Sequence, residues 1–147
     1  MKRFVFRLEP VLNYKVHQER MAQLEVAKAR KALEACEAKI KVLMEDANAA
    51  ARDLDARISK GISMDRYRFY TNYLSSMDTL IEREKNQQSL LAKQLTEKQN
   101  QLRQKTIDKK TLEILKEKQR ETYYQDVNAL FQKEADDMVT IRRKREP

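Results

Sequence analysis

Gly61 is the only glycine in the 147 residues of this chain. Glycine adopts positive φ more readily than any other residue, and it commonly follows the C-terminus of a helix. A chain that reverses direction many times needs many turn residues, but this sequence adds only two prolines to its single glycine. The sequence therefore predicts two long segments of one regular structure, joined by one turn.

The composition favours helices over a globular core. Charged residues make up 37% of the chain, aromatic residues only 7%, and the apolar side chains are spread thinly along it. The lone Cys36 allows no internal disulfide and fits a reducing compartment, and no apolar run is long enough to span a membrane. The opening MKRFVFRLEP is too short and too charged for a secretory signal. We expect one elongated all-α unit in the cytoplasm.

The first half of the chain shows a heptad pattern. Steps of three and four residues from Leu8 to Leu54 reach apolar side chains, interrupted at Lys15 and Glu19. A pattern sustained over about seven repeats is typical of a left-handed coiled coil. Pro10 suits the first turn of this helix, because the N–H that proline lacks would have no partner there.

A second, weaker seam follows the glycine. It runs from Tyr67 to Leu102 and passes through the polar Glu84 and Gln88. Ser63 is a suitable N-cap for this helix. We therefore expect helix one at about 8–58, a turn at 59–63, helix two at about 64–141 and a basic tail at 142–147, within a single domain covering 1–147.

Folding the chain at residue 61 pairs positions whose numbers sum to about 122, and this register brings the apolar positions of both seams together. The first helix begins near Leu8, so nothing should pair with residues after about 116. Helix two should project beyond helix one. Its projecting part still carries an apolar stripe with an eleven-residue repeat, which favours nearly straight packing. The stripe consists of Tyr123, Val127, Leu130, Met138 and Ile141, with Glu134 in the same row, and Phe131 and Ala135 widen it. Either it binds a second molecule or it is a frayed helical tail.

A second apolar group lies beside the turn. Phe69, Tyr73 and Leu80 fall on the flank of the second helix, and Met77 lies at the border with the seam. Large apolar side chains outside a two-helix interface indicate a contact site. The alternative is a broader hairpin interface that covers part of them.

The residues give no support for catalysis. His17 is the only histidine, and a single glycine cannot build a phosphate-binding loop. The carboxylates alternate with lysine and arginine at helical spacing, which is typical of solvated ion pairs. We expect no enzyme, no cofactor and no metal.

The net charge of +8 permits an acidic partner, and residues 98–120 hold eight basic side chains against three acidic ones. Phosphate binding without sequence preference is therefore an alternative function, although this segment lacks aromatic residues for base stacking. The alternative is a basic coiled-coil adaptor for nucleic acid or for an acidic protein surface. It predicts binding that weakens steeply with salt and depends on Lys109 and Lys110.

Two stretches resemble a known family. The opening FVFRLEPVLNYKVHQER and the turn GISMDRYRFYTNYL, together with the long second helix and the basic C-terminus, look like the bacterial flagellar export protein family FliJ. The resemblance covers essentially the whole chain. It implies a soluble component of the type III export apparatus that resembles the stalk of rotary ATPases, inserts into the export ATPase ring, and contacts the cytosolic domain of the export gate and export chaperones. It would lie at the cytoplasmic face of the inner membrane.

The resemblance also assigns surfaces. The gate-binding surface would comprise Leu43, Tyr73, Met77 and Leu80, to which the apolar flank adds Phe69; Glu84 departs from the histidine of the family pattern. By analogy with the stalk, the ends of both helices would face the ATPase ring. These residues are Phe4, Phe6, Leu8, Leu12, Tyr123, Val127, Leu130, Phe131, Met138 and Ile141. The two partner surfaces are expected at opposite ends of the rod.

Overall fold

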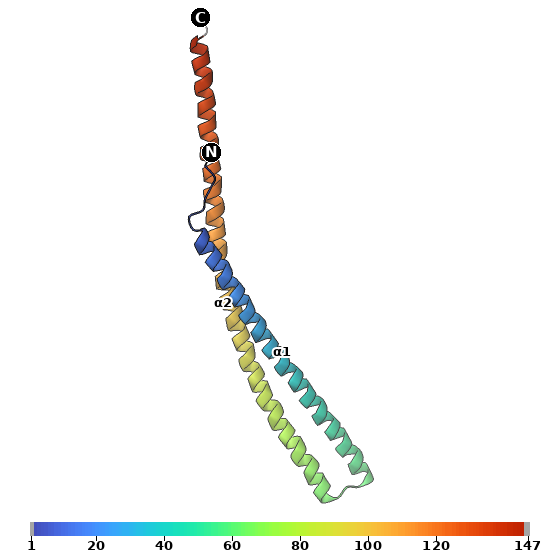
Figure 1. Cartoon of the computed structure of the whole chain (residues 1–147). Helices are drawn as coiled ribbons and strands as arrows, with labels where there is room; N and C mark the ends of the chain where they lie inside the picture. The colour runs from blue at the N-terminus through green and yellow to red at the C-terminus, as the bar shows by residue number, and fades with distance from the viewer. Residues whose placement is uncertain (1, 146–147) are drawn as a thin grey trace. The chain divides into compact units, whose positions relative to one another are not determined.

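The computed structural model describes residues 2–145 and consists of two helices, α1 (Glu9–Lys60) and α2 (Met64–Arg145). They pack against each other in antiparallel directions, so the predicted all-α helical hairpin is confirmed (Figure 1). The described residues form two compact units. Unit 1 combines the residues up to Arg20 with those from Arg103 onward, and unit 2 is Met21–Leu102.

The turn in unit 2 is built as the sequence predicts. Gly61 has a φ of 89°, and its N–H donates a hydrogen bond to the Ile58 carbonyl at 3.2 Å. Ser63 caps α2, since its Oγ accepts the Arg66 N–H at 3.3 Å. Asp65 lies in the first turn of α2, where the helix dipole favours a negative charge. The single glycine therefore marks the reversal of the chain.

The seam of unit 2 follows the predicted heptad positions. Its buried apolar side chains are Val26, Cys36, Ile40, Leu54 and Met77. Three polar contacts across the two helices fix the register, because the residue numbers of each pair sum to 123, against about 122 expected. These pairs are Asp53–Tyr70, Lys39–Glu84 and Glu25–Lys98.

The polar positions of the second seam make contacts across the hairpin. Glu84 accepts a hydrogen bond from Lys39 Nζ at 2.7 Å, and its backbone carbonyl lies 3.4 Å from Cys36 Sγ. Gln88 Nε2 donates to Glu37 Oε1 at 3.4 Å. Burial and the neighbouring Glu84 raise the pKa of the Cys36 thiol, so the thiol stays protonated within the seam.

Unit 1 contains a polar layer where the first seam was interrupted. Lys109 Nζ donates a hydrogen bond to Glu19 Oε1 at 3.0 Å, and the two side chains are only 21% and 12% exposed. Lys15 Nζ lies 3.9 Å from Asp108 Oδ2 beside them. The interruptions are therefore ion pairs between α1 and α2, with Glu19 almost entirely buried.

The N-terminal segment corrects the expected end of the pairing. Residues 2–8 precede α1 without helical structure and lie along α2 (Figure 1). Phe6 is buried near the Lys116 ammonium, the ring of Phe4 lies 5.7 Å from that of Tyr123, and the Tyr123 hydroxyl donates a hydrogen bond to the Lys2 carbonyl. The expectation that nothing pairs beyond about 116 was wrong. An extended chain advances about twice as far per residue as a helix, so this short segment reaches further along α2.

Beyond this segment α2 continues without cover. Every described residue from 128 to 145 is exposed. The helix ends at Arg145 and not near 141, so most of the expected basic tail is helical; residues 146 and 147 lie outside the described range. Four basic residues occupy the last turn, where they complement the negative end of the helix dipole.

Gly61→Ala should destabilise the hairpin by about 1 kcal/mol, because a Cβ is disfavoured at positive φ. Nothing lies within 4 Å of the position of that Cβ, so the cost is conformational and not steric. Gly61→Asn is the matched control and should retain most of the stability, since asparagine tolerates positive φ better. Urea unfolding followed by circular dichroism measures both variants, and equal losses would contradict the conformational explanation.

Lys109→Met should destabilise the protein by about 1–3 kcal/mol at neutral pH, because it leaves Glu19 buried without its charged partner. The hydrogen bond from Lys109 is the main cause that lowers the pKa of Glu19. The contribution of this carboxylate to stability is therefore fully present above the ordinary glutamate pKa and is lost as the pH falls through the lowered value.

Thermal unfolding at neutral pH and in acid checks this prediction. The exposed neighbour Lys110 supplies the control Lys110→Met, which should change stability little. A stability difference between Lys109→Met and the wild type that does not shrink in acid would contradict the role of the ion pair.

Candidate functional site

The first candidate surface lies near the turn in unit 2 and comprises Phe69, Tyr73 and Leu80; we call it the turn surface. Its side chains are 70%, 40% and 41% exposed. The ring of Phe69 packs edge-on against Tyr70 at 6.2 Å between centroids, which holds the ring beside the seam while leaving most of it in solvent. The predicted apolar flank therefore exists as an exposed surface.

Two other residues assigned to gate binding are more buried than the turn surface. Met77 is the buried residue of α2, with only 6% of its area exposed, and Leu43 on α1 is half-buried. Met77 lies at the border between the apolar flank and the seam, and the packing of α1 against α2 places it in the seam. Met77 therefore contributes little exposed area to the turn surface.

A polar cluster holds Tyr70 next to the turn surface. The Tyr70 hydroxyl donates a hydrogen bond to Asp53 Oδ2 at 2.6 Å, and Arg57 Nε lies 3.3 Å from the same oxygen. The Arg57 guanidinium also lies 5.7 Å from the centre of the Tyr70 ring. The hydrogen bond lowers the pKa of Asp53 and raises the pKa of Tyr70. Sequence analysis missed this cluster, because the register decides which side chains meet across the hairpin.

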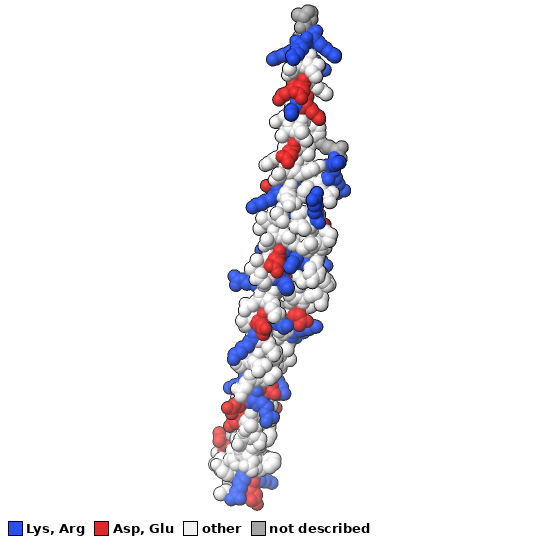
Figure 2. Space-filling model, turned by 90° about the vertical axis from the view of Figure 1, so that its left-hand side faces the viewer, with Lys and Arg blue, Asp and Glu red and all other residues white. Residues whose placement is uncertain are grey.

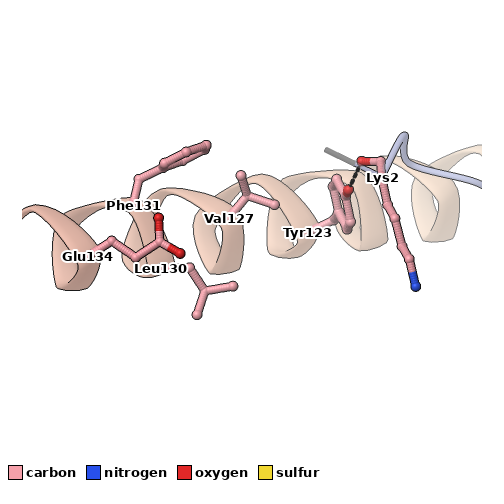
Figure 3. A pocket seen from close by; sticks show the side chains of 6 residues that line it. All are labelled: Lys2, Tyr123, Val127, Leu130, Phe131 and Glu134. Atoms are coloured by element: carbon pink, nitrogen blue, oxygen red, sulfur yellow. Dashed lines mark hydrogen bonds between the residues drawn. The ribbon is translucent and has the colours of Figure 1, made fainter.

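The second candidate surface is a groove on α2 in unit 1, which we call the tail groove. It has a volume of about 330 Å³ and is largely apolar, and its side chains from α2 lie along three turns of the helix, with Tyr123 and Val127 half-buried (Figure 3). It is lined by Lys2, Tyr123, Val127, Leu130, Phe131 and Glu134. Sequence analysis found the residues of α2 from their helical spacing and missed Lys2, which comes from a segment without periodicity.

The remaining residues assigned to the ATPase fall into two classes. Met138 and Ile141 continue the stripe of the tail groove and are more than half exposed. Phe6 and Leu12 are buried against α2, Phe4 is half-buried, and Leu8 is 38% exposed. Phe6 and Leu12 therefore hold the N-terminal part of the chain on α2, and the exposed surface is provided by α2 itself.

The basic stretch 98–120 is partly neutralised within the molecule. Four of its eight cations form ion pairs with carboxylates of the described residues: Lys98, Lys109, Lys116 and Arg120. Lys109 contributes to the fold, so a charge reversal there would also disturb the hairpin. Lys110 is the better probe of the nucleic-acid alternative, because it is exposed.

The described residues contain neither a cluster of three potential metal-ligating side chains nor a helix long and apolar enough to cross a membrane.

Comparison with known proteins identifies a family and a solved structure of similar fold. The family model described as "Flagellar FliJ protein" matches residues 4–147. The chain belongs to the FliJ family. A putative YscO homolog from Chlamydia trachomatis is similar in structure, with a TM-score of 0.67 and 18% identity over 97% of this chain and 96% of that one. A comparison with curated protein sequences gives no match.

Membership of the FliJ family makes this chain a component of a type III export apparatus. The resemblance of the opening and turn stretches to this family is thereby confirmed. The solved structure shares the fold at low sequence identity, so the two-helix architecture is common to both chains.

Tyr70→Phe should raise the pKa of Asp53 toward its ordinary value, because it removes the main hydrogen bond that lowers it. The Asp53 carboxylate stabilises the fold above its ordinary pKa, and this contribution is lost as the pH falls through the lowered folded value. An NMR titration of the Asp53 carboxyl measures the shift. An unchanged pKa would show that the hydrogen bond is not formed in solution.

Proposed function

We propose that this FliJ-family protein couples the export ATPase to the export gate. The tail groove contacts the ATPase ring and promotes its assembly and activity, and the turn surface contacts the cytosolic domain of the export-gate membrane protein. Export chaperones bind the same protein. It lies at the cytoplasmic face of the inner membrane through these partners.

The observation that carries this proposal is the presence of one exposed apolar surface in each compact unit. Phe69 in unit 2 and Leu130 in unit 1 are 70% and 62% exposed. Exposed aromatic and aliphatic side chains gathered in one place are typical of binding surfaces, and a few such residues carry most of the binding energy. Two separate surfaces suit a protein that binds two partners.

The uncovered end of α2 supports the assignment of the first partner. An isolated helix gains no packing energy from an apolar stripe that faces water. A hydrophobic channel through a ring would cover such a stripe on several sides, which fits a helix whose described residues from 128 to 145 are all exposed.

Leu130→Ala should weaken binding to the export ATPase by about tenfold or more, because it truncates an exposed side chain at the centre of the tail groove. Ring formation and ATP turnover of a hexamer-forming export ATPase measure the effect. Tyr73→Ala is the matched control, since it should leave ATPase stimulation intact while weakening binding to the cytosolic domain of the gate.

If both variants kept full activity in both assays, coupling through these surfaces would be rejected. Lys110→Glu adds a test of the nucleic-acid alternative, because a role in phosphate binding requires loss of function in this variant.

A further inference from the structure

The tail groove is apolar, and the part of α2 that forms it is acidic. Residues 121–138 carry five carboxylates and one lysine, a net charge of −4 in a chain whose net charge is +8. Figure 2 shows acidic side chains next to the basic residues that end α2. This part of α2 therefore differs in sign from the chain as a whole, while Lys2 supplies a positive charge at the end of the groove near Tyr123 (Figure 3).

Three of these carboxylates lie at the groove or beside it. Glu134 is part of the groove wall (Figure 3), and Asp126 lines an adjoining hollow that shares Tyr123 with it. Asp137 follows Glu134 by three residues and so lies on the neighbouring part of the helix surface. Among the described residues none of the three forms an ion pair, whereas Glu9 and Glu19 in the same unit are paired with lysines of α2. Their charges are therefore available to a partner.

We infer that the tail groove binds a basic amphipathic helix of the partner protein, with lysine or arginine side chains set beside Glu134 and Asp137. A helix fits because the groove runs along α2 from Tyr123 to Glu134, about 16 Å or three turns, and presents its side chains at the spacing that packs against another helix. The inference rests on the proposed function, since it gives the chemistry of the partner for the same surface.

The charges also discriminate against a second copy of this chain as the occupant. In an antiparallel pair of α2 helices the numbers of facing residues have a constant sum, and no single sum sets a basic residue opposite Asp126, Glu134 and Asp137 together. The register that sets Arg142 of one copy beside Asp126 of the other, for example, sets Glu134 against its own counterpart. A parallel pair would oppose all three carboxylates. Like charges that face each other within an interface are destabilising, whereas a basic helix meets all three favourably.

Binding of two synthetic peptides to the full chain tests this inference. Both are amphipathic helices of about three heptads with the same apolar stripe, one flanked by lysine and the other by glutamate. The lysine-flanked peptide should bind at least tenfold more tightly, although the net charge of the whole protein opposes it. Fluorescence anisotropy at physiological salt measures both affinities.

Charge variants show whether the groove is the binding site. Glu134→Lys should reverse the preference between the two peptides. Asp136→Lys is the matched control, because Asp136 lies about 200° around the helix from Glu134 and carries the same charge; it should leave the preference unchanged. Leu130→Ser should abolish binding of both peptides, and circular dichroism should show the same helix content in all variants.

Equal binding of the two peptides, no binding of either, or the same effect of Glu134→Lys and Asp136→Lys would overturn the inference. So would self-association of the full chain that is lost in Leu130→Ser, measured by sedimentation, because a second copy would then occupy the groove.

If the peptide preference is absent while Leu130→Ala still abolishes ATPase stimulation, this inference fails and the proposed function stands. If the preference is present while Leu130→Ala leaves stimulation intact, the proposed function fails and the inference stands.

Discussion

The structure depends on one narrow seam between two antiparallel helices. A two-helix interface leaves one side of each helix in water, and no described side chain is completely buried. The apolar seam therefore supplies attraction but little discrimination between neighbouring registers, because most of its positions are alanine, leucine or other aliphatic side chains. The register needs a second source of specificity.

The turn and the polar contacts supply that specificity. Gly61 sets the point of reversal. Within unit 2, the contacts Asp53–Tyr70 and Lys39–Glu84 hold the register of the two helices. In unit 1 the ion pair Glu19–Lys109 also favours the observed register. A shifted register would separate the two side chains and bury a charge away from its partner, which is unfavourable. Polar residues that weaken the heptad pattern thus determine which positions meet.

The same seam explains where the two candidate surfaces lie. Residues of α2 that face α1 or the N-terminal segment pack within the protein. Met77 is buried in the seam, and Tyr123 contacts the N-terminal segment. Apolar residues on the flank, or beyond the end of the covering segment, stay in solvent. Phe69 and Leu130 are the most exposed apolar residues of their respective surfaces, which is why we propose that partner proteins cover them.

The sequence by itself determined the helical hairpin, its turn, the seam positions and the two apolar stripes, because these follow from local periodicity and from the conformational preference of one glycine. Only the tertiary structure decided that Phe6 is buried, that the polar interruptions are ion pairs, and that residues 2–8 cover α2 as far as Tyr123. Periodicity fixes the face of a helix on which a side chain lies. How much of that face is covered depends on the register of two segments far apart in the chain, and on a non-helical segment that has no periodicity to read.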